Sequence, residues 1–239
     1  MSDLRIVNIQ DLLSANELNT YFLDVIAIVR FSICDYAWRK IRSVPNQYTN
    51  IFLVCDTYKE KSIKSGERQK RGQGKRYVIQ NPDMKFPFNF ADFMHNSDNK
   101  TMLLNLIEQS LIDDNEKLTY QTIYFSNVNH CTLISGNEVR LIPEFVSDHE
   151  EADTKLVALV HYAVLSSGQS VMVRSPSGDI DILILFSLHQ REGIHILIDN
   201  GNGKSRKILD INSSGLSLTE RQALAGIHSF SGNDYVSSF

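Results

Sequence analysis

Apolar residues recur along this chain with two periods, one typical of helices and one typical of strands. The helical spacing occurs in four segments, at residues 34–44, 99–112, 149–167 and 217–230. Short apolar or alternating runs predict strands at residues 20–29, 51–56 and 170–175, several more within 120–142, and a hairpin over 193–211. Because strands and helices alternate along the chain, we expect an α/β fold with a mainly parallel central sheet flanked by helices.

Length and composition suit a folded protein with a sizeable core. The 239 residues, 42% of them hydrophobic, predict a single domain over residues 1–239. Cys34, Cys55 and Cys131 form no CxxC motif, so we expect reduced, buried thiols. The first residues lack a basic stretch followed by an apolar run, so we expect no signal peptide, and no apolar run approaches the roughly 18 residues of a membrane span. We therefore expect an intracellular monomer, nuclear or cytoplasmic, that does not enter a membrane.

Acidic residues stand next to apolar runs, most clearly in the segment RSPSGDIDILIL at residues 174–185. A buried, unpaired carboxylate costs several kcal/mol, so something must compensate these acids. Ligands of open α/β sheets gather at the carboxyl ends of the strands. The acids near predicted strand ends or helix starts are Asp24, Asp56, Glu151, Asp153, Asp179, Asp181 and Asp234.

Carboxylates are the ligands that hard cations such as Mg²⁺ and Mn²⁺ prefer. The sequence has no HxH, HExxH or cysteine cluster of the kind that binds zinc. Each acid also has an ordinary structural explanation. Glu151 suits the start of a helix through the helix dipole, Asp179 suits an N-cap, and Asp234 suits a turn.

Residues 59–76 are strongly basic, with eight Lys or Arg residues and two Glu residues in a chain of net charge −4. One interpretation is a solvated surface helix or loop. The other is a phosphate-binding segment, in which interleaved glycines predict mobility and the flanking Tyr58 and Tyr77 stack on bases. The candidate nucleic-acid-binding residues in it are Lys59, Lys61, Lys70, Lys75 and Arg76.

The order of the acidic motifs resembles the flap-endonuclease and XPG-type nucleases, a branch of the PIN-like fold, and is most similar to domains of this kind found in animal genomes. The motifs are FLDVIAIV with Asp24, VCDTYK with Asp56, EADT with Glu151 and Asp153, SGDID with Asp179 and Asp181, and GNDY with Asp234. A further motif, KSGERQKR at residues 64–71, is similar to the family's KSGE…KR. The chain departs from the family in having Asp153 where a Glu is usual.

The resemblance implies a PIN/FEN-like three-layer fold and a two-metal nuclease. The seven acids would hold two Mg²⁺ or Mn²⁺ ions, and Lys64 and Arg71 would be the catalytic cations that polarise the cleaved phosphate. The substrate would be DNA or RNA, single-stranded or flapped. The family carries a duplex-gripping helical element after the last acid. Because this chain ends five residues after Asp234, we expect that element to be missing.

Two other functions stay open at this point. A nucleic-acid-binding remnant of such a nuclease, without catalytic activity, would keep the same acids. A different phosphotransfer enzyme on a Rossmann-like sheet ranks last, because the sequence has neither GxxxxGK[ST] nor GxGxxG.

Overall fold

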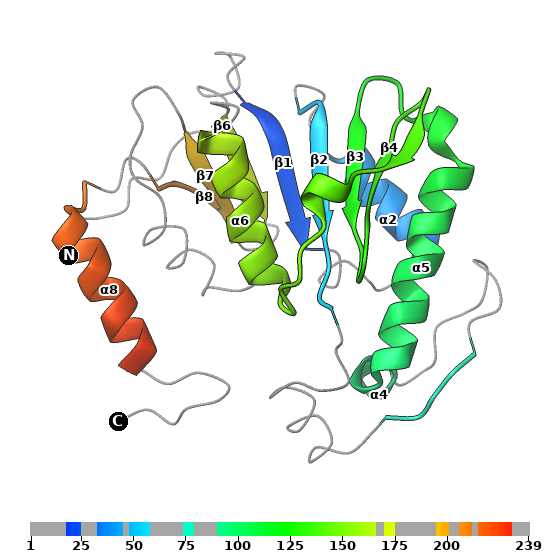
Figure 1. The fold of residues 1–239 in the computed structure, drawn as a ribbon, viewed down its shortest axis with the longest axis horizontal. Helices are drawn as coiled ribbons and strands as arrows, with labels where there is room; N and C mark the ends of the chain where they lie inside the picture. The colour runs from blue at the N-terminus through cyan, green and yellow to red at the C-terminus, as the bar shows by residue number, and fades with distance from the viewer. Residues whose placement is uncertain are drawn as a thin grey trace. The chain divides into compact units, whose positions relative to one another are not determined.

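The computed structural model describes residues 18–24, 33–44, 48–57, 74–78, 90–165, 170–174, 195–200, 206–211 and 215–230 (Figure 1). The chain divides into two compact units. One comprises residues 24–154, and the other combines the residues up to Leu23 with those from Lys155 onward. Strands and helices occur in both units, so the α/β class is confirmed. The expected single domain stays a prediction.

The unit of residues 24–154 has four strands in the order β5-β4-β3-β2. Strands β2 and β3 are parallel, whereas β3–β4 and β4–β5 are antiparallel. Helices α2 and α5 pack against each other. The elements are α2 (Ile33–Arg42), β2 (Asn50–Val54), α4 (Phe90–His95), α5 (Ser97–Asp113), β3 (Thr122–Ser126), β4 (Cys131–Ile134), β5 (Val139–Leu141) and two 3₁₀ turns, Asn115–Lys117 and Pro143–Phe145.

The core of this unit follows from its apolar runs. Every residue from Ile51 to Cys55 is buried, as expected for a strand covered on both faces. Helix α5 adds Leu104, Ile107 and Leu111, whose spacing places them on one side of the helix. The three-residue strand β5 differs, because Val139, Arg140 and Leu141 are all exposed.

The other unit has four strands in the order β1-β6-β7-β8. The pairs β1–β6 and β6–β7 are parallel, and β7–β8 is antiparallel, which confirms the hairpin predicted over residues 193–211. Three-residue apolar runs in β6 and β7 are buried throughout. The elements are β1 (Leu18–Asp24), α6 (Ala152–Leu165), β6 (Ser170–Arg174), β7 (Ile196–Asn200), β8 (Lys207–Asp210) and α8 (Leu218–Phe230).

The capping box that begins α8 is formed as predicted. The Glu220 N–H donates to Ser217 Oγ at 3.3 Å, and the Ser217 N–H donates to Glu220 Oε2 at 2.8 Å. Together these bonds satisfy two of the N–H groups that a helix start leaves without intrahelical partners. The bonds from Ser217 lower the pKa of Glu220.

A mainly parallel sheet is not what the structure has, because the described strand pairs are mixed. Three pairs are parallel and three are antiparallel. The reason is the length of the connections. Strands joined by a tight turn, as β4 and β5 are by the Ser135–Glu138 hydrogen bonds, must run antiparallel, whereas a parallel pair needs a longer crossover.

Candidate functional site

The carboxyl end of β2 meets the start of α6 within the unit of residues 24–154. The Ala152 N–H donates to Asp56 Oδ1 at 2.8 Å. The Thr57 N–H donates to the Glu150 carbonyl oxygen at 2.7 Å. These two bonds join segments that are 96 residues apart in the chain. The Asp56 carboxylate thereby lies at the N–H group of Ala152, whose neighbours in the sequence are Glu151 and Asp153. We call these three half-buried acids the acidic corner.

Local structure explains part of this arrangement. The first N–H groups of a helix have no intrahelical acceptor, and the helix dipole favours negative charge there. Asp56 supplies an acceptor from another segment, and Asp153 lies in the first turn of α6. Glu151 therefore has the structural role predicted for it, as a residue at the start of a helix. Asp56 adds a third acid at the same helix start.

The donor atoms of the corner suit a hard cation, since all of them are carboxylate oxygens. The bond from Ala152 fixes the orientation of the Asp56 carboxylate. Within the described part of the chain, no three or more His, Cys, Asp or Glu residues form a group that could hold a metal ion. A metal site at the corner therefore stays a prediction.

The structure does not describe the side chains of the other predicted acids or of the two catalytic cations. Asp24 is the last residue of β1, and its side chain lies outside the description. The convergence of all seven acids, and the position of the two catalytic cations, stay predictions. The residues outside the described ranges are Lys59, Lys61, Lys64, Lys70, Arg71, Asp179, Asp181 and Asp234.

Lys75 and Arg76 are described, and both are exposed on an extended segment, residues 74–78. The Lys75 Nζ atom lies 5.6 Å from the centre of the Tyr77 ring. The Arg76 Nε atom lies 3.5 Å from Asp98 Oδ2, with both side chains more than half exposed. Their exposure fits either interpretation of the basic segment, and their role in binding nucleic acid stays a prediction.

A buried carboxylate that the sequence did not single out is Asp199, near the carboxyl end of β7. It is 1% exposed and accepts hydrogen bonds from two arginines. Arg206 donates through Nε and Nη2 at 2.7 and 2.8 Å, and Arg174 donates through Nη1 at 2.7 Å. Burial raises the pKa of Asp199, but the hydrogen bonds and charges of Arg206 and Arg174 outweigh burial, so the pKa is lowered. The run IHILID, like IFLVCD, is mostly apolar and ends in an aspartate, and this pattern could have identified Asp199 as an acid near a strand end.

A second buried carboxylate, Glu108 of α5, connects that helix to the turn between β3 and β4. Glu108 accepts from Asn127 Nδ2 at 2.6 Å and from Thr132 Oγ1 at 2.6 Å, and it lies 2.8 Å from His130 Nε2. Glu108 and Thr132 are buried, and the His130 side chain is 39% exposed. No motif in the sequence predicts this cluster.

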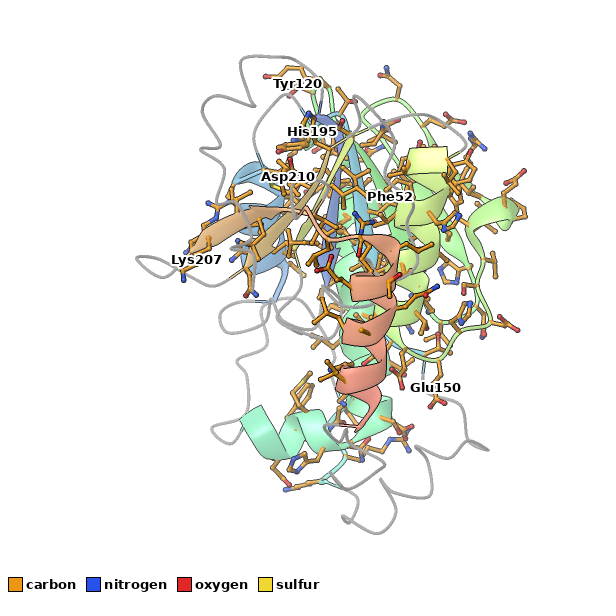
Figure 2. All side chains as sticks on the ribbon, turned by 90° about the vertical axis from the view of Figure 1, so that its left-hand side faces the viewer. Phe52, Tyr120, Glu150, His195, Lys207 and Asp210 are labelled. Atoms are coloured by element: carbon orange, nitrogen blue, oxygen red, sulfur yellow. The ribbon has the colours of Figure 1, made fainter. Side chains whose placement is uncertain are left out.

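The amino end of β7 carries a histidine–carboxylate pair. His195 Nδ1 lies 3.1 Å from Asp210 Oδ2, and Figure 2 shows the two labelled side chains beside each other. The His195 N–H donates to Ser170 Oγ at 2.9 Å, which fixes the backbone at this position. Asp210 is buried, so this pair resembles the other two clusters in compensating a buried acid.

Comparison with known proteins assigns no family to the chain. A scan against protein-family models finds no match, and a search of curated proteins finds none. Of the helices that the structure describes, none is long and apolar enough to cross a membrane. A proposal about function must therefore rest on the motifs and contacts of the chain itself.

Proposed function

We propose that this chain is a divalent-metal-dependent nuclease that hydrolyses phosphodiester bonds of DNA or RNA. The observation that supports it best is the hydrogen bond from Ala152 to Asp56. That bond joins the motif VCDTYK to the motif EADT, two of the motifs that resemble the flap-endonuclease family. A simple helix cap needs only one acceptor at this position. Here the acceptor Asp56 comes from a distant segment, and Asp153 lies in the first turn of the same helix.

The roles of the residues follow from their chemistry. Asp56, Glu151 and Asp153 would hold metal together with Asp24, Asp179, Asp181 and Asp234. Carboxylates gathered this way repel one another, and a divalent cation offsets the repulsion. When bound, two Mg²⁺ or Mn²⁺ ions supply an activated water and stabilise the leaving oxygen.

The cations of the chain would act on the phosphate. Lys64 and Arg71 would contact the cleaved phosphate and neutralise its growing negative charge. Lys59, Lys61, Lys70, Lys75 and Arg76 would bind the phosphates on either side, which is where most nucleic-acid affinity arises. The proposal includes the PIN/FEN-like three-layer arrangement that the resemblance implies, with a single-stranded or flapped substrate.

The test is cleavage of labelled single-stranded, flapped and duplex DNA and RNA, with Mg²⁺, with Mn²⁺ and with a chelator. The informative variant is Asp56→Asn, because the amide oxygen still accepts the Ala152 N–H while the charge is removed. A matched control is Asp113→Asn, which makes the same change at an exposed position at the end of α5.

We expect metal-dependent cleavage by the wild type and by Asp113→Asn. The cleavage rate of Asp56→Asn should be more than about 100-fold lower than that of the wild type. Even substitutions of residues that only support the metal ligands lower metal affinity or activity about 10–100-fold. The binding of substrate by Asp56→Asn should be retained. Cleavage by Asp56→Asn at the wild-type rate would refute the role of the corner. Binding without any metal-dependent cleavage would favour the inactive remnant instead.

A further inference from the structure

Two buried asparagines hold the extended segment of residues 74–78 against the junction of α4 and α5. Asn99 donates through Nδ2 to the Lys75 carbonyl oxygen at 2.8 Å, and its Oδ1 accepts the Tyr77 N–H at 2.8 Å. Asn96 donates through Nδ2 to the Gly74 carbonyl oxygen at 2.9 Å. We call these bonds the asparagine clamp. All of its residues belong to the unit of residues 24–154.

The clamp is tied firmly into the helices beside it. Asn99 is 0% exposed, and it donates a further bond to the Phe93 carbonyl oxygen at 3.0 Å. Asn96 is the N-cap of α5, where its Oδ1 accepts the N–H groups of Asp98 and Asn99. Each amide therefore bonds both a helix and the segment. Removing either one leaves polar groups of the helix and the segment without partners, which destabilises this arrangement.

Gly74 allows the segment to approach this closely. A Cβ atom at position 74 would lie 2.3 Å from the Asp92 carbonyl oxygen and 3.0 Å from His95 Cβ. Backbone atoms of a helix cannot move aside easily, so a larger residue would push the segment away. Gly74 and the two asparagines together fix one backbone position for residues 74–77.

The clamped backbone carries two exposed cations and an aromatic ring. Lys75 and Arg76 are exposed, and Lys75 Nζ lies 5.6 Å from the centre of the Tyr77 ring. The half-buried Tyr77 ring is supported by Phe93, with the ring centres 5.7 Å apart. Cations for phosphates next to a ring for bases are the parts of a single-strand binding surface.

We infer that residues 74–78 are a preorganised anchor for single-stranded nucleic acid, and that Asn96 and Asn99 are its positioning residues. The inference rests on the proposed function and adds the place where the strand is first held. Lys75 and Arg76 contact phosphates, and Tyr77 stacks on a base. Because the clamp fixes the backbone in advance, binding loses less conformational entropy than binding by a loose basic segment.

Binding of labelled oligo-dT and oligo-U, followed by fluorescence anisotropy in a chelator over a range of salt concentrations, tests this surface apart from cleavage. The charge variant is Lys75→Gln with Arg76→Gln. The clamp variants are Asn99→Ala and Gly74→Ala, both of which keep the two cations.

Gly136→Ala is the matched control. Its Cβ would lie 2.5 Å from the Leu118 carbonyl oxygen, a backbone clash of the same kind in the turn between β4 and β5. Protection of the Tyr77 amide from hydrogen exchange reports directly whether the clamp has opened, because that N–H donates to the buried Asn99.

We expect each clamp variant to lose Tyr77 protection and to bind about 2- to 10-fold more weakly, with the salt dependence nearly unchanged. The charge variant should bind more weakly and lower the salt slope by about 2. Gly136→Ala should bind like the wild type even if its melting temperature falls. That pattern separates positioning from general destabilisation.

Three other outcomes would each contradict a different part of the inference. If both clamp variants lose protection but bind like the wild type, the asparagine clamp does not position a binding surface. If the charge variant binds like the wild type, residues 74–78 are not the anchor. If anionic lipid vesicles bind this segment more tightly than the oligonucleotides, the partner is a membrane surface. None of these results changes the Asp56→Asn cleavage assay, so the proposed function is judged separately.

Discussion

Asp56 and Asp199 occupy the same kind of position in their two units but have different surroundings. Both come at the end of a mostly apolar run, IFLVCD and IHILID, and these runs contribute to β2 and β7, each of which has a parallel neighbour. Asp199 is 1% exposed, and two arginines bond both of its oxygens. Asp56 is half-buried and accepts the N–H of Ala152 at the start of a helix, between Glu151 and Asp153 in the sequence.

The difference shows that a strand end alone does not identify a catalytic acid. Asp199 brings charge into the interior, and Arg174 and Arg206 compensate it within the same unit. Its role is structural by every contact described. At the acidic corner, the Asp56 carboxylate instead accepts a backbone N–H at the start of a helix whose first turn carries another acid.

The largest effect should come from removing the carboxylate of Asp199. Asp199→Ala leaves Arg174 and Arg206 facing each other beside a buried space, so we expect a loss of about 3–5 kcal/mol in the free energy of unfolding. Urea unfolding at pH 7 measures it. Replacing all three residues together by apolar residues of similar volume should restore much of the loss. A loss below about 1 kcal/mol for the single change would mean that the ion pairs are not structurally important.

Acid should weaken the same contact by a smaller amount. The folded pKa of Asp199 is lowered from its ordinary value of 3.8. Its contribution to stability is therefore fully present above pH 3.8, and it is lost as the pH falls through that value towards the folded pKa. The difference in stability between the wild type and Asp199→Asn should narrow below pH 4 when measured by urea unfolding at a series of pH values. A difference that stays constant down to pH 2 would contradict the lowered pKa.

Substitution of Asp56 should have the smallest effect on stability. Asp56→Ala removes one hydrogen bond at a helix start and should cost about 0.5–1.5 kcal/mol. Asp56→Asn should cost less, because the Ala152 N–H keeps an acceptor. Millimolar Mg²⁺ should raise the melting temperature of the wild type and of Asp199→Asn, but raise that of Asp56→Asn less. An equal rise in all three proteins would place the bound metal elsewhere.

The elements that could be predicted from the sequence are those whose patterns involve residues close together in the chain. The helices at residues 34–44, 99–112, 149–167 and 217–230 are confirmed as α2, α5, α6 and α8. Ser217 and Glu220 form the expected capping box because all of its atoms lie within four residues. Helix α4 was not expected, since its six residues are too few to show a helical period.

What escaped prediction depends on partners far apart in the chain. The buried charge of Asp199 is compensated by Arg206 and also by Arg174, which is 25 residues away in the chain. Glu108 is buried because Asn127, His130 and Thr132 surround it from another pair of strands, and nothing near Glu108 in the sequence indicates that. For the candidate site, the sequence paired Asp56 with the EADT motif only through a family resemblance, and the Ala152 bond now gives that pairing a physical contact.

The exposed strand β5 has a consequence for how this protein behaves at high concentration. It stands at one end of the order β5-β4-β3-β2, and the apolar side chains Val139 and Leu141 are 41% and 61% exposed. An outer strand of this kind offers its backbone to another chain, which promotes aggregation. Arg140 stands between the two apolar residues, with Nε 2.8 Å from Glu138 Oε1. A strand of three residues with a charge at its centre is a poor template for pairing with another chain. Strand β5 therefore protects this edge of the sheet from aggregation.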